Sequence, residues 1–235
     1  MIIRHKFLDF INHEKHFLFE QGFKKLPSDS YMKAFQKKIT DDVSYFIRFG
    51  TGFGFLEIFY GVSIRKFDAF CEIHEIETFP FFGTIGLSKD SFVDLTNVKT
   101  LDEIGDDFRQ FYFEAIAPFF EANNHLSGMF KTLRKVKGRP VGNDENHSLA
   151  DAGMWADLIL TRVFKPEELE GRANHYYQAM LDMNKDNKFQ ILNADELAEY
   201  HKQMKDKFDA LVVKMQNLDI EKLKADLGIE GDNEA

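Results

Sequence analysis

The stretch that most constrains the fold is VSYFIRFGTGFGFLEIFYGVSI, residues 43–64. Apolar and polar residues alternate along its first half, and β-branched and aromatic residues fill its second half, as in antiparallel strands. Gly50, Thr51 and Gly52 lie between the halves, and glycine adopts the positive φ of a tight turn, so the stretch predicts a β-hairpin that reverses at residues 50–52. The second strand is apolar on both faces, which predicts a central place in a sheet, and its aromatic residues, Phe59 among them, are expected to be mostly core.

Two amphipathic helices are predicted to cover this sheet, over residues 2–21 and 100–122. Apolar residues recur at helical spacing in both segments, and Gly22 follows the first where a left-handed C-cap belongs. Thr100 and Glu103 form a capping-box signature at the start of the second, and Pro118 predicts a kink in it. The N-terminal part is therefore expected to be an antiparallel sheet packed by two long helices.

Phenylalanine and charge divide the chain in two. Of the 26 Phe residues, 23 precede residue 144, where 19 basic residues balance 19 acidic ones; 11 basic and 20 acidic residues follow, so the later part carries the whole net charge of -9. Glycine and proline without apolar periodicity mark a linker between the parts. We expect an α+β fold, with an α+β domain over 1–137, a linker over 138–147, an all-α helical bundle over 148–228 and a disordered tail over 229–235.

Charge and apolar runs bear on the partners and the compartment. The acidic half argues against an anionic membrane or nucleic acid as partner, with the basic group at 131–139 left as a weaker nucleic-acid alternative. Cys71 is the only cysteine, so no internal disulfide forms. No apolar run reaches the ~20 residues that span a bilayer, and residues 1–20 lack the h-region of a signal peptide. The sequence predicts a cytoplasmic, soluble protein.

Residues 197–218 carry a coiled-coil-like seam, because their apolar side chains follow a four-three alternation. Packing of this helix against the two preceding helices as an antiparallel bundle is the favoured interpretation. A homodimer through the same seam is the alternative.

The sharpest metal-like motif is DMNKDNKFQILN, residues 182–193. Asp182, Asn184 and Asp186 would supply oxygen ligands at the first, third and fifth positions of an EF-hand loop. The twelfth position needs a bidentate Glu, and Asn193 stands there instead. These three residues are weak calcium candidates, and the sequence gives no reason to expect a metal or another cofactor.

Other candidate sites are weaker still. GTGFG, residues 50–54, is followed by a strand pattern rather than the helix that a phosphate loop needs. His13 and His16 with Glu20, and the group Glu72, His74, Glu75 and Glu77, lack the spacing of a helical zinc site and are interpreted as solvated faces. No catalytic residue is identified; the least unfavourable candidates for a hydrolase or nuclease site are His74, Glu75, His147, Asp144 and Glu145.

The first helix, then Gly22-Phe23-Lys24-Lys25, then aromatic strands and a helix ending in FEAIAPFF, residues 113–120, resemble an uncharacterised bacterial domain-of-unknown-function family. The resemblance covers about residues 2–122, implies a small α+β domain and supplies no catalytic residues to transfer. Some members occur in settings that suggest toxin-neutralising immunity proteins.

Three functions remain open. The favoured one is a non-enzymatic, protein-binding protein of a bacterium that recognises another protein through its surface, an immunity protein being one form of it. The alternatives are a hydrolase or nuclease with an unidentified polar site and a weak calcium-responsive helical module.

Overall fold

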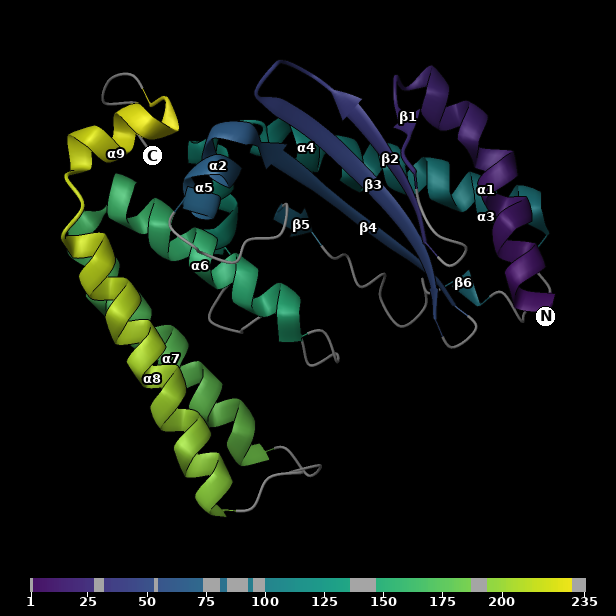
Figure 1. The fold of residues 1–235 in the computed structure, drawn as a ribbon. Helices are drawn as coiled ribbons and strands as arrows, with labels where there is room; N and C mark the ends of the chain where they lie inside the picture. The colour runs from purple at the N-terminus through teal and green to yellow at the C-terminus, as the bar shows by residue number, and fades with distance from the viewer. Residues whose placement is uncertain are drawn as a thin grey trace. The chain divides into compact units, whose positions relative to one another are not determined.

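The computed structural model describes residues 2–27, 32–52, 55–73, 81–83, 93–94, 100–135, 147–186 and 194–229 (Figure 1). The chain divides into two compact units. Unit 1 comprises residues 1–68 and 80–124, and unit 2 comprises residues 69–79 and 125–235.

Unit 1 contains an antiparallel sheet of six strands within the described part of the chain. Its order is β1-β2-β3-β4-β5, with β6 also paired to β4. The strands are β1 (Lys24–Lys25), β2 (Met32–Lys38), β3 (Val43–Gly52), β4 (Phe55–Ile64), β5 (Phe81–Gly83) and β6 (Val93–Asp94). The predicted hairpin and the central place of its second strand are thus confirmed.

The predicted turn at residues 50–52 is wrong, because β3 runs through Gly52. Gly50 pairs with Glu57 and Gly52 pairs with Phe55, so both glycines belong to the paired strands; residues 53–54 lie outside the described residues. Gly50 provides space instead of a turn. A Cβ at this position would lie 3.3 Å from Glu57 Oε2 and 3.6 Å from Phe59 Cε2, so both side chains reach over the glycine.

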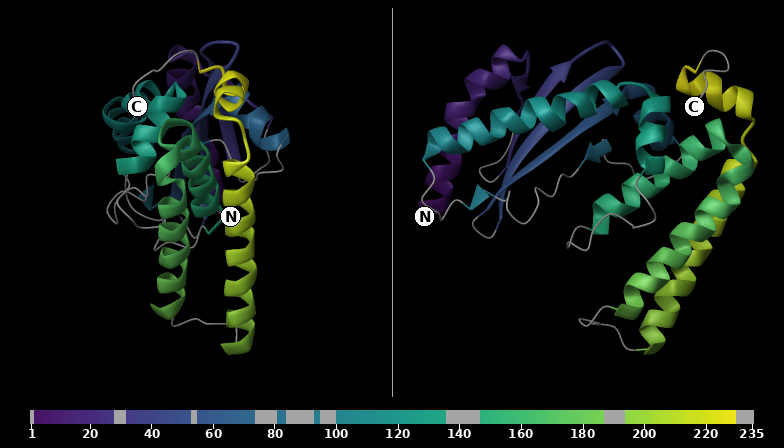
Figure 2. Two further views of the ribbon diagram at one scale, coloured as in Figure 1. Left: turned by 90° about the vertical axis from the view of Figure 1, so that its left-hand side faces the viewer. Right: turned by 180° about the vertical axis from the view of Figure 1, so that it is seen from behind.

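Two long helical segments pack on one face of the sheet, as the sequence predicts. The first is α1 (Ile2–Glu20), which is followed by Gly22 at φ 84°. The second begins with α3 (Leu101–Phe111) and continues through the π-helical η1 (Tyr112–Ile116) into α4 (Ala117–Asn123), and Figure 2 shows the three as one continuous run. The predicted capping box is confirmed: Thr100 N donates to Glu103 Oε2 (2.7 Å), and Glu103 N donates to Thr100 Oγ1 (3.3 Å).

The π-helical stretch lies immediately before Pro118. Proline has no N–H to donate and its ring crowds the preceding turn, so an α-helical ladder cannot continue unchanged there. A wider turn, in which Ala117 N donates to Tyr112 O, accommodates the proline without ending the helix. The kink expected from the sequence therefore takes the form of a π-bulge.

Aromatic rings fill the core between the helices and the inner face of the sheet. Phe49 meets Phe10 (5.7 Å), Phe108 (5.2 Å) and Phe35 (5.9 Å) edge-on, each distance joining ring centroids. Tyr45 stacks on Phe120 at 4.4 Å. Such pairs add about 0.5 to 1.5 kcal/mol each beyond the burial of apolar area, so this layer fixes both helices on the sheet.

The regular secondary structure of unit 2 is entirely helical in the described residues. Part of α2 (Arg65–Ile73) belongs to it, since the boundary between the units falls within that helix. The other helices are α5 (Leu126–Lys135), α6 (His147–Phe164), the 3₁₀ turn η2 (Pro166–Glu168), α7 (Leu169–Asp186), α8 (Ala194–Gln216) and α9 (Ile220–Leu227). The sequence placed α5 in the first domain, whereas contacts group it with unit 2. The α+β class with a helical C-terminal part is confirmed.

Helix α6 lies at the centre of unit 2, and all residues from 156 to 161 are buried. Arg162 on α6 donates to the carbonyl oxygens of Met215 (2.9 Å), Gln216 (3.0 Å) and Leu218 (3.1 Å), which satisfies the open end of α8. Phe208 and Met215 of the coiled-coil-like seam are buried inside the unit, as the bundle interpretation expects. A homodimer through the rest of residues 197–218 stays a prediction.

Among the described residues, no helix combines the length and the apolar character that crossing a bilayer requires.

Candidate functional site

The face of the sheet opposite α1 and α3 is the first candidate surface. Side chains alternate between faces along a strand, and the observed register places one set together on β2, β3 and β4. Figure 1 shows α3 and α4 behind the sheet, and the face turned away from them is called the outer face below. The outer face carries Met32, Ala34, Gln36, Phe46, Arg48, Gly50, Glu57, Phe59 and Gly61.

The outer face combines aromatic, sulfur-containing and charged side chains. Phe46 and Phe59 are half-buried, and 39% of Met32 is exposed. The core position expected for Phe59 is therefore wrong, because Phe59 pairs with Arg48 and so projects from the outer face, away from the helices. Arg48 lies directly opposite Phe59 on the neighbouring strand. Aromatic residues, Met and Arg are the types enriched in protein interfaces.

Glu57 is the unusual group on this face. Its carboxylate is half-buried and makes no hydrogen bond or ion pair with the described residues, Arg48 included. Burial raises the pKa of the Glu57 carboxyl above its ordinary value. A carboxylate that has lost part of its water without gaining a cation is left short of partners.

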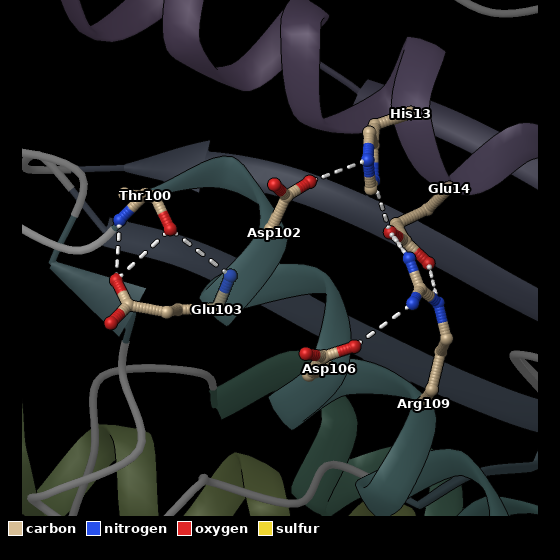
Figure 3. A network of polar contacts seen from close by, with 7 residues as sticks. All are labelled: His13, Glu14, Thr100, Asp102, Glu103, Asp106 and Arg109. Carbon is tan, nitrogen blue, oxygen red and sulfur yellow. Dashed lines mark hydrogen bonds and ion pairs between the residues drawn. The ribbon is translucent and has the colours of Figure 1, made fainter.

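The most extensive polar network lies between α1 and α3 (Figure 3). Glu14, of which 1% is exposed, accepts from Arg109 Nη2 (2.8 Å) and Nε (3.1 Å). His13 Nδ1 lies 2.7 Å from Glu14 Oε1, and His13 Nε2 lies 3.1 Å from Asp102 Oδ1. Arg109 Nη1 also donates to Asp106 Oδ1 at 3.0 Å.

This network holds helices together and leaves no reactive group. Both oxygens of Glu14 already accept from charged or ring donors, so its carboxylate has no oxygen ready to take a proton from a substrate. A carboxylate only accepts, so both His13 contacts are hydrogen bonds when both ring nitrogens carry protons. Gly105 makes the close approach of α1 and α3 feasible, because a Cβ there would overlap Glu14 Oε1.

A second buried carboxylate lies in unit 2. Asp157 on α6 is 0% exposed, and its Oδ2 accepts from Arg172 Nε (2.7 Å) and Tyr176 Oη (2.7 Å) on α7. Burial, and then the nearby charge of Asp157, raise the pKa of the Tyr176 hydroxyl. Asp157 Oδ1 and Thr161 Oγ1 are buried without a hydrogen-bond partner in the described part of the chain. The cluster ties α6 to α7, and its enclosure keeps a substrate from reaching it.

The candidates named from the sequence are spread over α1, α2, α6 and residues outside the described part. His13 belongs to the Glu14 network, whereas the ring of His16 lies 6.4 Å from that of Phe19. Glu72 is exposed near the end of α2. His74, Glu75, Glu77, Asp144 and Glu145 lie outside the described residues, and His147 is the first residue of α6.

The calcium candidates lie at the end of α7. That helix includes Asp182, Asn184 and Asp186, and residues 187–193 lie outside the described part. The described residues contain no group of three or more His, Cys, Asp or Glu placed to hold a metal ion. The calcium-responsive module stays a prediction.

Sequence reasoning missed Glu14, Glu57 and Asp157. The strand alternation in residues 55–64 would have placed Glu57 on the same face as Phe59, so a signal for that residue was present. No local sequence signal marks Glu14 or Asp157, since the arginine that pairs with each carboxylate lies on another helix.

No family model, curated protein or solved structure matches the chain. The resemblance to a bacterial domain of unknown function stays a prediction.

Proposed function

We propose that this protein acts by binding another protein through the outer face of its sheet, without catalysing a reaction. The observation that supports this most directly is the composition of that face. Phe46, Phe59 and the exposed Met32 surround Arg48 and Glu57, and this mixture of aromatic, flexible apolar and charged groups is typical of binding hot spots.

The packing of unit 1 favours a rigid binding surface. The inner face is fixed by the aromatic layer and by the Glu14 network, so the strands that carry the outer face are held from behind. Rigid strands lose little conformational entropy on binding, which favours recognition of a partner by a preformed surface.

The neutralisation of a bacterial toxin in the cytoplasm is one form of this function. It rests on the sequence resemblance, and in that form the partner is the toxin. A hydrolase or nuclease is less favoured, since both buried carboxylates that the structure describes are engaged between helices.

The proposal is tested by affinity capture with three baits. The baits are the wild-type chain, Phe59→Ser on the outer face and Phe113→Ser as a matched control. Phe113 lies on η1 in the helical layer and is 56% exposed, more than Phe59. Circular dichroism melts establish that all three baits are folded.

The expected result is a protein enriched by the wild type and by Phe113→Ser but lost with Phe59→Ser, together with saturable binding of that purified protein. Equal recovery with Phe59→Ser would exclude the outer face. Loss of the captured protein with Phe113→Ser alone would indicate that the binding surface lies on the helical layer.

A further inference from the structure

The inference below rests on the proposed function and names the chemistry of the partner. It starts from the group formed by Gly50, Glu57 and Phe59, called the Glu57 cluster. Glu57 and Phe59 are two residues apart on β4, so both project from the outer face. The absence of a side chain at Gly50 leaves the space over which Glu57 Oε2 and the Phe59 ring extend.

No described residue is paired with the Glu57 carboxylate. Glu57 is half-buried beside an aromatic ring and forms no ion pair or hydrogen bond with the described residues. Other carboxylates of unit 1 that are partly or fully withdrawn from water do have such partners: Glu14 has Arg109, and Asp68 accepts from Ser63 Oγ at 2.5 Å. Among these three groups, Glu57 alone lacks a donor.

We propose that the Glu57 cluster binds an arginine side chain of the protein partner. A guanidinium matches both parts of the cluster, since its N–H groups pair with a carboxylate and its plane stacks on an aromatic ring. Glu57 supplies the charge and Phe59 supplies the ring, and the absence of a side chain at Gly50 lets both groups lie together over the neighbouring strand. Charge complementarity thus selects a basic partner, although the net charge of unit 1 alone would not.

The test uses the full chain, labelled with ¹⁵N, and arginine amide as the probe. Citrulline amide is the neutral isostere of the probe, and Glu20→Gln is the matched control for Glu57→Gln, because Glu20 is an exposed carboxylate on α1. Amide shifts of Gly50 and Phe59 report occupancy of the cluster. Spectral dispersion shows whether each variant keeps its fold.

Arginine amide should shift the Gly50 and Phe59 resonances saturably, and citrulline amide should not. Glu57→Gln should raise the Kd for arginine amide by at least about tenfold, as expected when hydrogen bonds to a charged group are lost, and Glu20→Gln should leave the Kd unchanged. Unsaturable shifts in the wild type, or equal binding of citrulline amide or by Glu57→Gln, would overturn the inference.

Failure here is distinct from failure of the proposed function. If arginine amide binds as expected but affinity capture recovers no protein that depends on Phe59, the proposed function is rejected and arginine binding by the Glu57 cluster is retained. If a protein that depends on Phe59 binds Glu57→Gln as tightly as the wild type, the proposed function is retained and arginine recognition by the Glu57 cluster is rejected.

Discussion

Replacement of Gly105 by Ala tests the Glu14 network, because the network reverses the sign of the change in the free energy of unfolding that this substitution usually produces. In the interior of an exposed helix, Gly→Ala stabilises by about 1 kcal/mol, because glycine loses more backbone entropy on folding. At Gly105, an added Cβ would overlap Glu14 Oε1 and lie 3.0 Å from Arg109 Nη2 and 3.2 Å from Glu14 Cδ. The buried carboxylate has to move, and its ion pair with Arg109 is lost or distorted.

The magnitude follows from two opposing contributions. Breaking a buried ion pair costs about 3 to 5 kcal/mol, and the helix propensity of alanine returns about 1 kcal/mol, so Gly105→Ala should destabilise unit 1 by about 2 to 4 kcal/mol. Glu14→Ala removes the obstructing carboxylate. In that background, Gly105→Ala should stabilise by about 1 kcal/mol through propensity alone.

The assay is equilibrium urea unfolding of the four chains of this double-mutant cycle, followed by far-ultraviolet circular dichroism. Trp155, the only tryptophan, lies on α6. Its fluorescence shows whether unit 2 unfolds in the same transition. Stabilisation by Gly105→Ala in the wild-type background, or the same loss in both backgrounds, would refute the placement of the Glu14 carboxylate against α3.

Three further predictions concern buried polar groups. Stability should fall as the pH rises above about 10, by up to about 1.4 kcal/mol per pH unit and tyrosine, because burial raises the pKa of four hydroxyls and the unfolded chain releases their protons first. These hydroxyls are those of Tyr45, Tyr60, Tyr112 and Tyr176. Melting temperatures should fall less steeply with pH in Tyr60→Phe. Thr161→Val should stabilise unit 2 by about 1 kcal/mol in urea unfolding, since it removes a buried hydroxyl without a partner, and a loss of stability would show that the hydroxyl is bonded. Arg162→Met should lower the free energy of unfolding of unit 2 by about 1.5 to 3 kcal/mol and increase hydrogen exchange at the end of α8, because carbonyl groups there lose their donor. Unchanged hydrogen exchange at the end of α8 would contradict this cap.

Local signals in the sequence predicted the elements of the fold well. The capping box needs only Thr100 and Glu103, and the C-cap needs only Gly22, so neighbouring residues contain all the information. The hairpin follows from alternation within residues 43–64. Its turn was misplaced because a glycine signals freedom without saying whether that freedom serves a turn or makes space for side chains from another strand, as at Gly50.

The polar clusters could not be predicted, because each depends on residues far apart in the chain. Glu14 and Arg109 are separated by 95 positions, and nothing near Glu14 distinguishes it from an exposed helical glutamate. Phe59 shows the same limit for apolar residues. Its strand is apolar on both faces, and only the position of the helices decides which face becomes the inner one.

The two buried carboxylates differ in a way that bears on function. Glu14 and Asp157 each join a pair of helices through an arginine, so both act in the scaffold. Both oxygens of Glu14 are engaged in hydrogen bonds. Asp157 Oδ1 has no described partner, but it is buried and closed to a substrate. Of Glu14, Asp157 and Glu57, the last, on the outer face, is the one that is partly open to solvent and lacks a hydrogen-bond donor among the described residues. A carboxylate in that condition gains most from a cation brought by another molecule, and the proposed recognition of a partner at the sheet therefore makes Glu57 the group whose substitution tests it most directly.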